Sequence, residues 1–190
     1  MAELIVTEFI TLDGVMEAPG GEPSHPHTGW VGPFMENDPE LMPFKFEEQM
    51  RAESHLLGRV TYESFAGAWP QREGPFADKV NAMPKHVVSA TLEEPEWNNS
   101  TVVGGDVEAA VAKLKAETAG PILVAGSRTL VQELLRKDLV DELRLMIFPV
   151  VLGSGDRLWP DDNPEMTTLE VAETNTTPSG VQVNVFRRAS

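Results

Sequence analysis

The feature that most constrains this fold is the alternation of short apolar runs with amphipathic helical segments. The stretch GPILVAGSRTLVQELLRKDLVDELRLMIF, residues 120–148, shows it most clearly. An apolar run, Ile122–Val124, is followed by three small residues and then by a segment with helical spacing of its apolar positions. Those positions are Leu130, Val131, Leu134 and Leu135. Short apolar strands that alternate with helices predict a mainly parallel sheet with helices on both faces.

The same alternation extends over the chain and predicts a three-layer α/β fold in one domain, residues 1–190. The expected strands before the C-terminal hairpin are Leu4–Ile10, His55–Leu57, Lys85–Ser89, Thr101–Val103, Ile122–Val124 and Leu143–Val151. The expected helices begin at Asp38-Pro39, at Thr61, after an Asp106 cap and before Leu130. A closing antiparallel hairpin is expected from Leu169–Thr174 and Val181–Arg187. Three irregular stretches, at about 13–37, 70–75 and 153–164, separate these elements.

Composition excludes several classes of function. The net charge is −15, which repels nucleic acid and anionic membranes, so neither is expected as a partner. The chain has no cysteine, which excludes disulfides, thiolate metal sites and cysteine catalysis. The N-terminus lacks the basic start of a signal peptide, and no apolar run approaches the roughly 20 residues of a membrane helix. A cytoplasmic protein is the expectation.

Candidate ligand contacts follow three of the predicted strands. Gly58-Arg59, Ser89 and Gly126-Ser127 each come directly after a strand. Ligands of open parallel sheets bind beyond the carboxyl ends of the strands, so these residues are expected along one edge. The dinucleotide fingerprint, the phosphate loop and the nucleophile elbow are all absent, which argues against the classes of enzyme that use them.

The small residues Ala125-Gly126-Ser127 admit two interpretations. A helix that begins there directs backbone N–H groups at one point, which suits an anion. Alternatively, the residues are small only because the chain bends sharply. The turn by itself does not decide between them.

Other polar clusters carry weaker signals. His25-Pro26-His27 with Glu22 offers too few converging ligands, so no metal site is expected. The acidic residues Glu36, Asp38 and Glu40 are expected to be a solvated helix N-terminus.

In the order of its motifs the chain resembles the dihydrofolate reductase superfamily. The Gly-Arg-x-Thr motif is Gly58 to Thr61, the next cofactor strand ends at Ser89, and the pyrophosphate turn is Ala125-Gly126. The mobile loop after the first strand corresponds to TLDGV, Thr11 to Val15. The Gly-Asp-x-x-aromatic-Pro segment is carried by Gly155, Asp156, Trp159 and Pro160. The VLGSG sequence at 151–155 and the start LDG at 12–14 are most similar to the riboflavin-biosynthesis reductases, the C-terminal domain of the bifunctional deaminase–reductase.

The resemblance implies an NADPH-dependent reductase similar to 5-amino-6-(5-phosphoribosylamino)uracil reductase, and a homodimer. It implies cofactor contacts at Ile10, Gly58, Arg59, Thr61, Ser89, Ala125, Gly126, Ser127, Arg128, Thr129, Leu130 and Asp156. It implies catalytic positions at Asp13 and at Glu40, which would supply or relay a proton if burial raises its pKa. The dimer surface is expected from Leu143–Val151 and Val181–Phe186 at the sheet edge.

The substrate side departs from the dihydrofolate reductase pattern. The arginine for the folate carboxylate would fall near Met83 and the threonine near Ile147, and neither residue type is present there. A small heterocyclic substrate, pterin- or pyrimidine-like, or a small carbonyl compound is therefore expected rather than folate.

Several alternatives stay open at this level. Arg59 could form only a surface ion pair with Glu63, Thr61 could be an ordinary N-cap, and Glu40 could be a carboxylate in water. The chain could also be a non-catalytic nucleotide-binding or protein-interaction module. In that case the loop with Trp30 and Phe34 would be a partner surface.

Overall fold

The computed structural model describes residues 1–159 and 166–189, so Pro160 of the aromatic-proline motif lies outside the described residues. The chain forms two compact units. Unit 1 comprises Met1–Val6 and Lys45–Val140, and unit 2 comprises Thr7–Phe44 and Asp141–Ser190. The expectation of a single domain stays a prediction.

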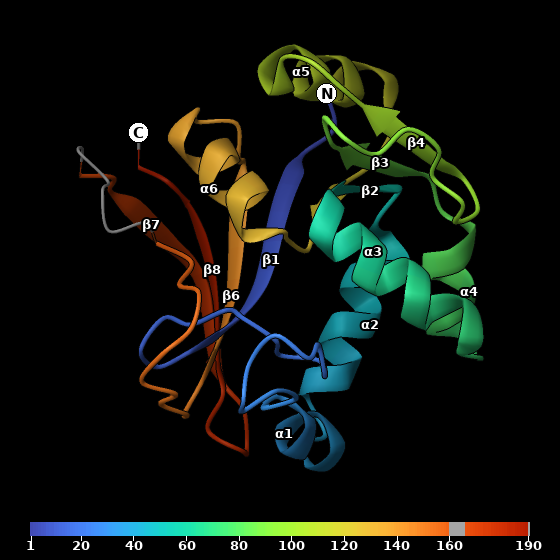
Figure 1. Ribbon diagram of the computed structural model, residues 1–190. Coiled ribbons are helices and arrows are strands. Elements are labelled where there is room, and N and C mark those ends of the chain that lie inside the picture. Colours follow the sequence, from blue (N-terminus) through green and yellow to red (C-terminus); the bar gives the residue numbers. More distant parts are fainter. Residues whose placement is uncertain (160–165, 190) are drawn as a thin grey trace. The chain divides into compact units, whose positions relative to one another are not determined.

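Unit 1 holds a parallel sheet in the order β4-β3-β2-β5-β1, to which β1 contributes its first residues (Figure 1). These strands are β4 (Ser100–Val103), β3 (Lys85–Val88), β2 (Ser54–Gly58), β5 (Ile122–Val124) and β1 (Leu4–Thr11). The helices of unit 1 are α3 (Arg59–Ala68), α4 (Pro75–Ala82), α5 (Val107–Glu117) and α6 (Arg128–Arg136), with the 3₁₀ turn η1 (Trp69–Gln71) after α3. Each strand is short and apolar, and the helices between them supply the crossover connections that parallel pairing requires.

Unit 2 contains the antiparallel part of the sheet. The strands are β6 (Glu142–Phe148), β8 (Gln182–Arg188) and β7 (Leu169–Thr176), in that hydrogen-bonded order. A short helix, α1 (Gly32–Asn37), belongs to this unit, and α2 (Leu41–Arg51) begins here and continues into unit 1. The α/β class, the mainly parallel sheet and the C-terminal antiparallel hairpin are therefore confirmed.

Two sequence expectations about the elements need correction. The helix expected from Asp38 begins only at Leu41, because the Asp38 carboxylate accepts the N–H of Glu40 and closes a turn in front of the helix. Two helices were not expected: α1 lies at the end of the irregular stretch 13–37, and α4 follows the stretch at 70–75. Both carry proline in their first turn, where its missing N–H costs nothing, and both are too short for their periodicity to stand out.

The expected dimer surface also needs correction. β8 pairs with β6 on one side and with β7 on the other, so β6 and β8 do not form the sheet edge. The edge is β7, which is exposed along nearly its whole length. The homodimer itself stays a prediction.

The long loop near the start of unit 2 contributes aromatic side chains to the core of that unit. Trp30 is 7% exposed, packs edge-on against Phe148, and donates its indole N–H to the carbonyl of Glu17 at 2.9 Å. Phe34 packs against the same ring of Phe148. These side chains therefore contribute to the core of unit 2. Trp30 is buried and so does not offer a partner surface, whereas Phe34 is half-buried.

Within residues 1–159 and 166–189, no helix combines the length and the apolar character needed to cross a membrane.

Candidate functional site

The three strand ends singled out in the sequence lie side by side in unit 1. β2 pairs in parallel with β3, with Gly58 opposite Val88, and on its other side with β5. Ser89, Arg59 and the turn at Gly126 therefore follow neighbouring strands in the order β3-β2-β5. The N–H of Gly58 also donates to the carbonyl of Gly126 at 3.2 Å, so two of the three turns are joined directly.

The small size of these turn residues has a steric cause. The Gly126–Ser127 peptide bond is cis. Gly126 has φ +93°, and a Cβ placed there would lie 2.5 Å from Oγ1 of Thr61. A Cβ at Gly58 would overlap Oγ of Ser127 and lie 2.9 Å from its backbone nitrogen. These close approaches confirm the tight-turn interpretation, and they leave room for the anion interpretation because both turns bring a helix N-terminus to the same edge.

Those two helix N-termini differ from the N-terminus of α5. In α5, Asp106 caps the helix by accepting the N–H of Glu108 at 3.1 Å, and Glu108 places a carboxylate in the first turn. The helices α3 and α6 have no side-chain cap and no acidic residue in the first turn. The first backbone N–H groups of a helix lack intrahelical acceptors, and the dipole makes that end positive. These two ends are therefore suited to an anionic ligand.

Among the predicted cofactor residues, Arg59 and Thr61 open α3, whereas Arg128, Thr129 and Leu130 open α6. Arg59 makes the alternative contact foreseen from the sequence, a two-pronged ion pair with Glu63 at 2.8 and 2.9 Å, with both side chains about half exposed. Because pairs of this kind contribute only about 0.3–0.5 kcal/mol, this one does not bar Arg59 from a ligand. Thr61 is not an N-cap, since its hydroxyl faces Gly126 across the two turns.

Ser89 follows β3 and uses its hydroxyl locally. The Oγ atom accepts the N–H groups of Thr91 and Leu92, at 3.1 and 2.9 Å. It therefore shapes the turn after β3.

Asp13 in unit 2 connects two loops. Its Oδ1 accepts the hydroxyl of Thr11 at 2.6 Å and the N–H of Leu152 at 3.2 Å, and its Oδ2 accepts the N–H of Gly153 at 2.8 Å. The bond from Thr11 and those from the two amides hold the pKa of Asp13 below its ordinary value, against the opposing effect of partial burial. A carboxylate in this state is a poor proton donor, so the geometry assigns Asp13 an anchoring task and gives no support to acid catalysis.

The two loop motifs of unit 2 pack against each other. Val15 forms an isolated bridge with Arg157, and the N–H of Met16 donates to the carbonyl of Asp156 at 2.9 Å. In return, the N–H of Asp156 donates to Oε2 of Glu17 at 2.9 Å. The loop that was expected to be mobile, Thr11 to Val15, and the residues just after it are therefore held by several contacts in this structure. The last predicted contact, Ile10, is a buried residue of β1.

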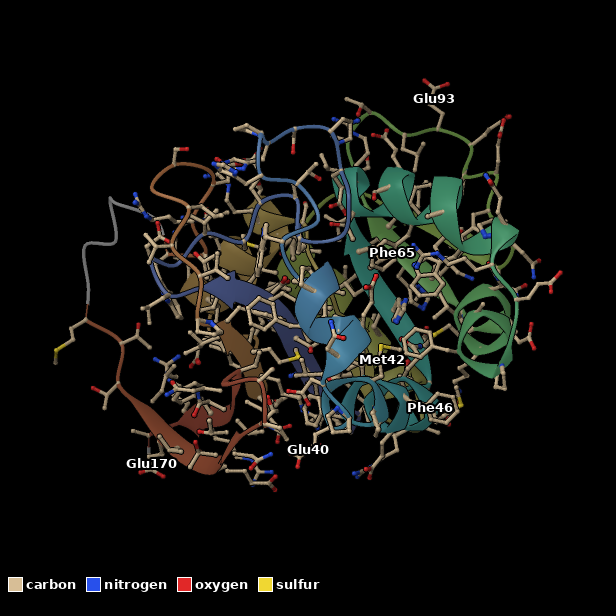
Figure 2. The ribbon with its side chains drawn as sticks, turned by 90° about the horizontal axis from the view of Figure 1, so that it is seen from below. Glu40, Met42, Phe46, Phe65, Glu93 and Glu170 are labelled. Atoms are coloured by element: carbon tan, nitrogen blue, oxygen red, sulfur yellow. The ribbon has the colours of Figure 1, made fainter. Side chains whose placement is uncertain are left out.

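Glu40 lies at the surface of unit 2, in the turn before α2 (Figure 2). Its Oε2 accepts the side-chain amide of Asn175, on β7, at 3.0 Å. The residue is exposed. Glu40 thus matches the alternative of a carboxylate in water.

The buried carboxylate of this region is Asp38, which the sequence had placed on a solvated helix end. It is 4% exposed, and Oδ2 accepts both the N–H and the hydroxyl of Ser179. Burial alone would raise the pKa of Asp38, but the hydrogen bonds from Ser179, Thr177 and the N–H of Glu40 outweigh it and keep the pKa below its ordinary value. The sequence analysis did not predict that Asp38 is buried, because an Asp-Pro pair is also typical of a helix N-terminus.

Lys85 is a second buried ionisable group that the sequence did not single out. It is fully buried on β3, and burial lowers its pKa to about 8. Its ammonium donates to the carbonyls of Asn81, Met83 and Asn98 at 2.8–2.9 Å, and it lies 4.2 Å from the ring centroid of Trp97. Because all three N–H bonds are committed to the backbone, Lys85 stabilises the end of α4 and has no donor left for a ligand.

Both ring nitrogens of His25 have hydrogen-bond partners within the chain. Nε2 of His25 lies 3.2 Å from the carbonyl of Ser154, and Nδ1 accepts the N–H of His27 at 3.0 Å. No group of three or more potential metal ligands occurs in the part of the chain that the structure describes.

The chain is similar to known proteins over most of its length. The chain is 30% identical to the uncharacterized protein YyaP of Bacillus subtilis over 188 residues, which are 96% of this chain and 93% of that one. It is 30% identical to the uncharacterized protein YwjB of the same organism over 132 residues, 70% of this chain and 72% of that one.

Solved structures share the fold. A putative riboflavin biosynthesis protein from Shewanella sp. PV-4 superposes with a TM-score of 0.71, at 21% identity and full coverage of both chains. Dihydrofolate reductase from Enterococcus faecalis, solved with NADP(H), superposes with a TM-score of 0.60 at 18% identity, covering 99% of this chain and 97% of that one. The model of the RibD C-terminal domain matches residues 2–183. The chain therefore belongs to the RibD C-terminal domain family.

Proposed function

We propose that this protein is an NADPH-dependent reductase that transfers a hydride to a small heterocyclic or carbonyl substrate. The family supports a reductase of the riboflavin-pathway type. The observation that carries the proposal is the pair of uncapped helix N-termini, α3 and α6, at adjacent strand ends of unit 1.

The pyrophosphate of the cofactor would bind where these helices begin. Gly126 lets the chain pass close to Thr61, and the first N–H groups of α6, from Arg128, Thr129 and Leu130, would face the anion. Each helix end contributes about 0.3–1 kcal/mol, and up to about 2 kcal/mol where it is partly buried. Such local contacts are needed because the net charge of −15 repels an anion at long range.

Arg59 would select NADPH over NADH. Its guanidinium stands at the start of α3 and matches a 2′-phosphate in charge and in fork geometry. No acidic residue lies in the first turn of α3, where an NAD-selective site would place one for the ribose hydroxyls. The phosphate would have to replace Glu63 as the partner of Arg59.

Hydride transfer requires little further chemistry from the chain. A bound nicotinamide supplies the hydride, while the protein orients the cofactor and excludes water. A proton source for the substrate is still needed. The hydrogen bonds that lower the pKa of Asp13 argue against Asp13 as that source. The two candidate proton sources are water and Glu40 after a substrate-induced change. Turnover measurements on a Glu40 variant can separate them.

Cofactor titration followed by a substrate screen tests the proposal. NADPH should raise the Tm of the purified protein more than NADH does, since a ligand at 100 times its Kd stabilises the native state by about 2.7 kcal/mol. NADPH oxidation should then be measured with pterins, pyrimidines and small carbonyl compounds. An unchanged Tm with both cofactors would contradict the proposal, and binding without any turnover would favour the non-catalytic module instead.

A further inference from the structure

The first turn of α3 carries a positive charge at the helix end where a negative charge is stabilising. Arg59 is the first residue of α3, and no acidic residue lies in that first turn. The N-terminal end of a helix is already positive, because its first N–H groups lack intrahelical acceptors and the peptide dipoles add up there. A cation at this end therefore lowers the stability of the helix unless an anion accompanies it.

Glu63 supplies an anion from the next turn of the same helix. Both of its carboxylate oxygens accept from one nitrogen of Arg59, Nη1, at 2.8 and 2.9 Å. Side chains of a helix lean toward its N-terminus, so a glutamate one turn further on brings its carboxylate back over the first turn. The positive end of α3 thus receives its negative charge from within α3.

This ion pair is closer than a comparable pair elsewhere in unit 1. Lys113 and Glu117 of α5 have the same spacing and the same order, with the cation first, but approach only to 3.9 Å, with side chains 72% and 62% exposed. The cation-first order is the less favourable one on a helix. Arg59 and Glu63 nevertheless form hydrogen bonds, with side chains 44% and 51% exposed. A phosphate that binds Arg59 must therefore displace a formed contact.

This displacement affects the two nicotinamide cofactors differently. The adenosine ribose of NADPH carries a 2′-phosphate, which competes with the Glu63 carboxylate for the guanidinium and repels that carboxylate after displacing it. The ribose of NADH carries a neutral 2′-hydroxyl, which does not repel a carboxylate. In NAD-selective sites a carboxylate is the group that accepts the ribose hydroxyl. Glu63 therefore opposes the preference for NADPH that Arg59 creates.

We propose that Glu63 is a specificity-determining residue that lowers the affinity for NADPH and limits the preference over NADH. The inference rests on the proposed function, because it requires the 2′-phosphate of NADPH to bind at Arg59. The preference that a titration measures is then the difference between two opposing contributions, one from Arg59 and one from Glu63.

Calorimetric titration of the wild type and of Glu63→Gln with NADPH and NADH tests the inference. Glutamine keeps the size of the side chain and removes its charge. The Kd of NADPH should fall by about threefold to tenfold, because the variant loses both the competing partner and the repulsion. The Kd of NADH should not fall by more than about twofold. An unchanged Kd of NADPH, or an equal gain for both cofactors, would overturn the inference.

Two further variants distinguish a local effect from a general loss of negative charge. Glu117→Gln removes the same charge from the comparable pair of α5 and should change the Kd of NADPH by less than about twofold. In an Arg59→Ala background, Glu63→Gln should also change this Kd by less than about twofold, because no guanidinium remains for which the carboxylate and the phosphate compete. An undiminished gain in that background, or the same gain in Glu117→Gln, would contradict a role exerted through Arg59.

The same titrations separate this inference from the proposed function. If NADPH binds through Arg59 but Glu63→Gln gains no affinity, the role of Glu63 is wrong and the reductase proposal stands. If Glu63→Gln gains affinity for NADPH but no compound of the substrate screen is reduced, the role of Glu63 stands and the proposed reductase activity is wrong. If none of these proteins binds NADPH, both are wrong.

Discussion

Two helix N-termini of unit 1 and two carboxylates of unit 2 differ in how the surrounding chain satisfies them. In unit 1, α3 and α6 begin at adjacent strand ends with no side-chain cap and no acidic residue in the first turn. In unit 2, the carboxylates of Asp13 and Asp38 are saturated with hydrogen bonds that join loops. We infer that the helix ends without a side-chain cap belong to the ligand side, whereas the saturated carboxylates maintain the fold.

The largest effect is expected at the paired turns of unit 1. Gly126→Val places a branched side chain at φ +93° and against Oγ1 of Thr61, so it should lower the free energy of unfolding by about 3 kcal/mol or more. Gly126 is therefore needed for the fold, in addition to its proposed role beside a phosphate. Urea denaturation measures the loss.

Gly67→Ala is the control for that substitution. Gly67 lies within α3, and no atom lies within 4 Å of the position that its new methyl group would take, so alanine should stabilise the protein by about 0.5–1 kcal/mol. A folded Gly126→Val protein with wild-type stability would show that the two turns do not constrain each other.

A smaller effect, about 1–3 kcal/mol, is expected from Asp38→Asn in unit 2, because the amide replaces a buried acceptor of several donors. The pKa of Asp38 is lower in the folded state, so the carboxylate's contribution to stability is present above the unfolded-state value of 3.8 and is lost as the pH falls below it. Denaturation at about pH 7 and about pH 3 should show wild type and variant converging in acid. A constant difference across this range would exclude ionisation as the source of the stability.

Next in size is Arg59→Ala, which probes the uncapped N-terminus of α3. It should weaken NADPH binding by about 1–2 kcal/mol, roughly fivefold to thirtyfold, and should erase most of the preference over NADH. Its effect on stability should stay near the roughly 0.3–0.5 kcal/mol of an exposed ion pair with Glu63. Titration of both proteins with both cofactors decides the matter, and an unchanged preference in the variant would place the 2′-phosphate elsewhere.

The smallest change in stability, below about 0.5 kcal/mol, is expected from Glu40→Gln, because this exposed carboxylate accepts one surface hydrogen bond. The variant is informative for turnover. If Glu40 supplies the proton, turnover with an identified substrate should fall while the Kd of NADPH stays the same. Wild-type turnover would leave water as the proton source.

Sequence reasoning succeeded where periodicity and turn chemistry agree. Asp106 caps α5 as expected, and the order of short apolar strands predicted the parallel part of the sheet and its three neighbouring strand ends. It could not find α4, which is only eight residues long, nor the pairing of Gly58 with Ser127, because the contact joins residues 69 positions apart.

The sequence did not predict which carboxylate of the acidic cluster is buried. Asp38 and Glu40 stand two residues apart in one acidic cluster, yet Asp38 is buried and Glu40 is exposed. The difference comes from the turn at Ser179, which provides donors to Asp38 from 141 residues away. No local pattern carries that information, since it depends on tertiary contacts.

The exposed edge strand β7 has a consequence for how the protein behaves at high concentration. A free strand edge is a template on which a second chain can add its own backbone, and long, flat, apolar edges lead to aggregation. β7 is protected from this outcome by a register shift between Val171 and Glu173 and by the charges of Glu170 and Glu173. Orderly self-association through β7 would have to bring these glutamates close to those of a second copy, so it should be favoured by salt or by mild acid, which weaken the repulsion between carboxylates.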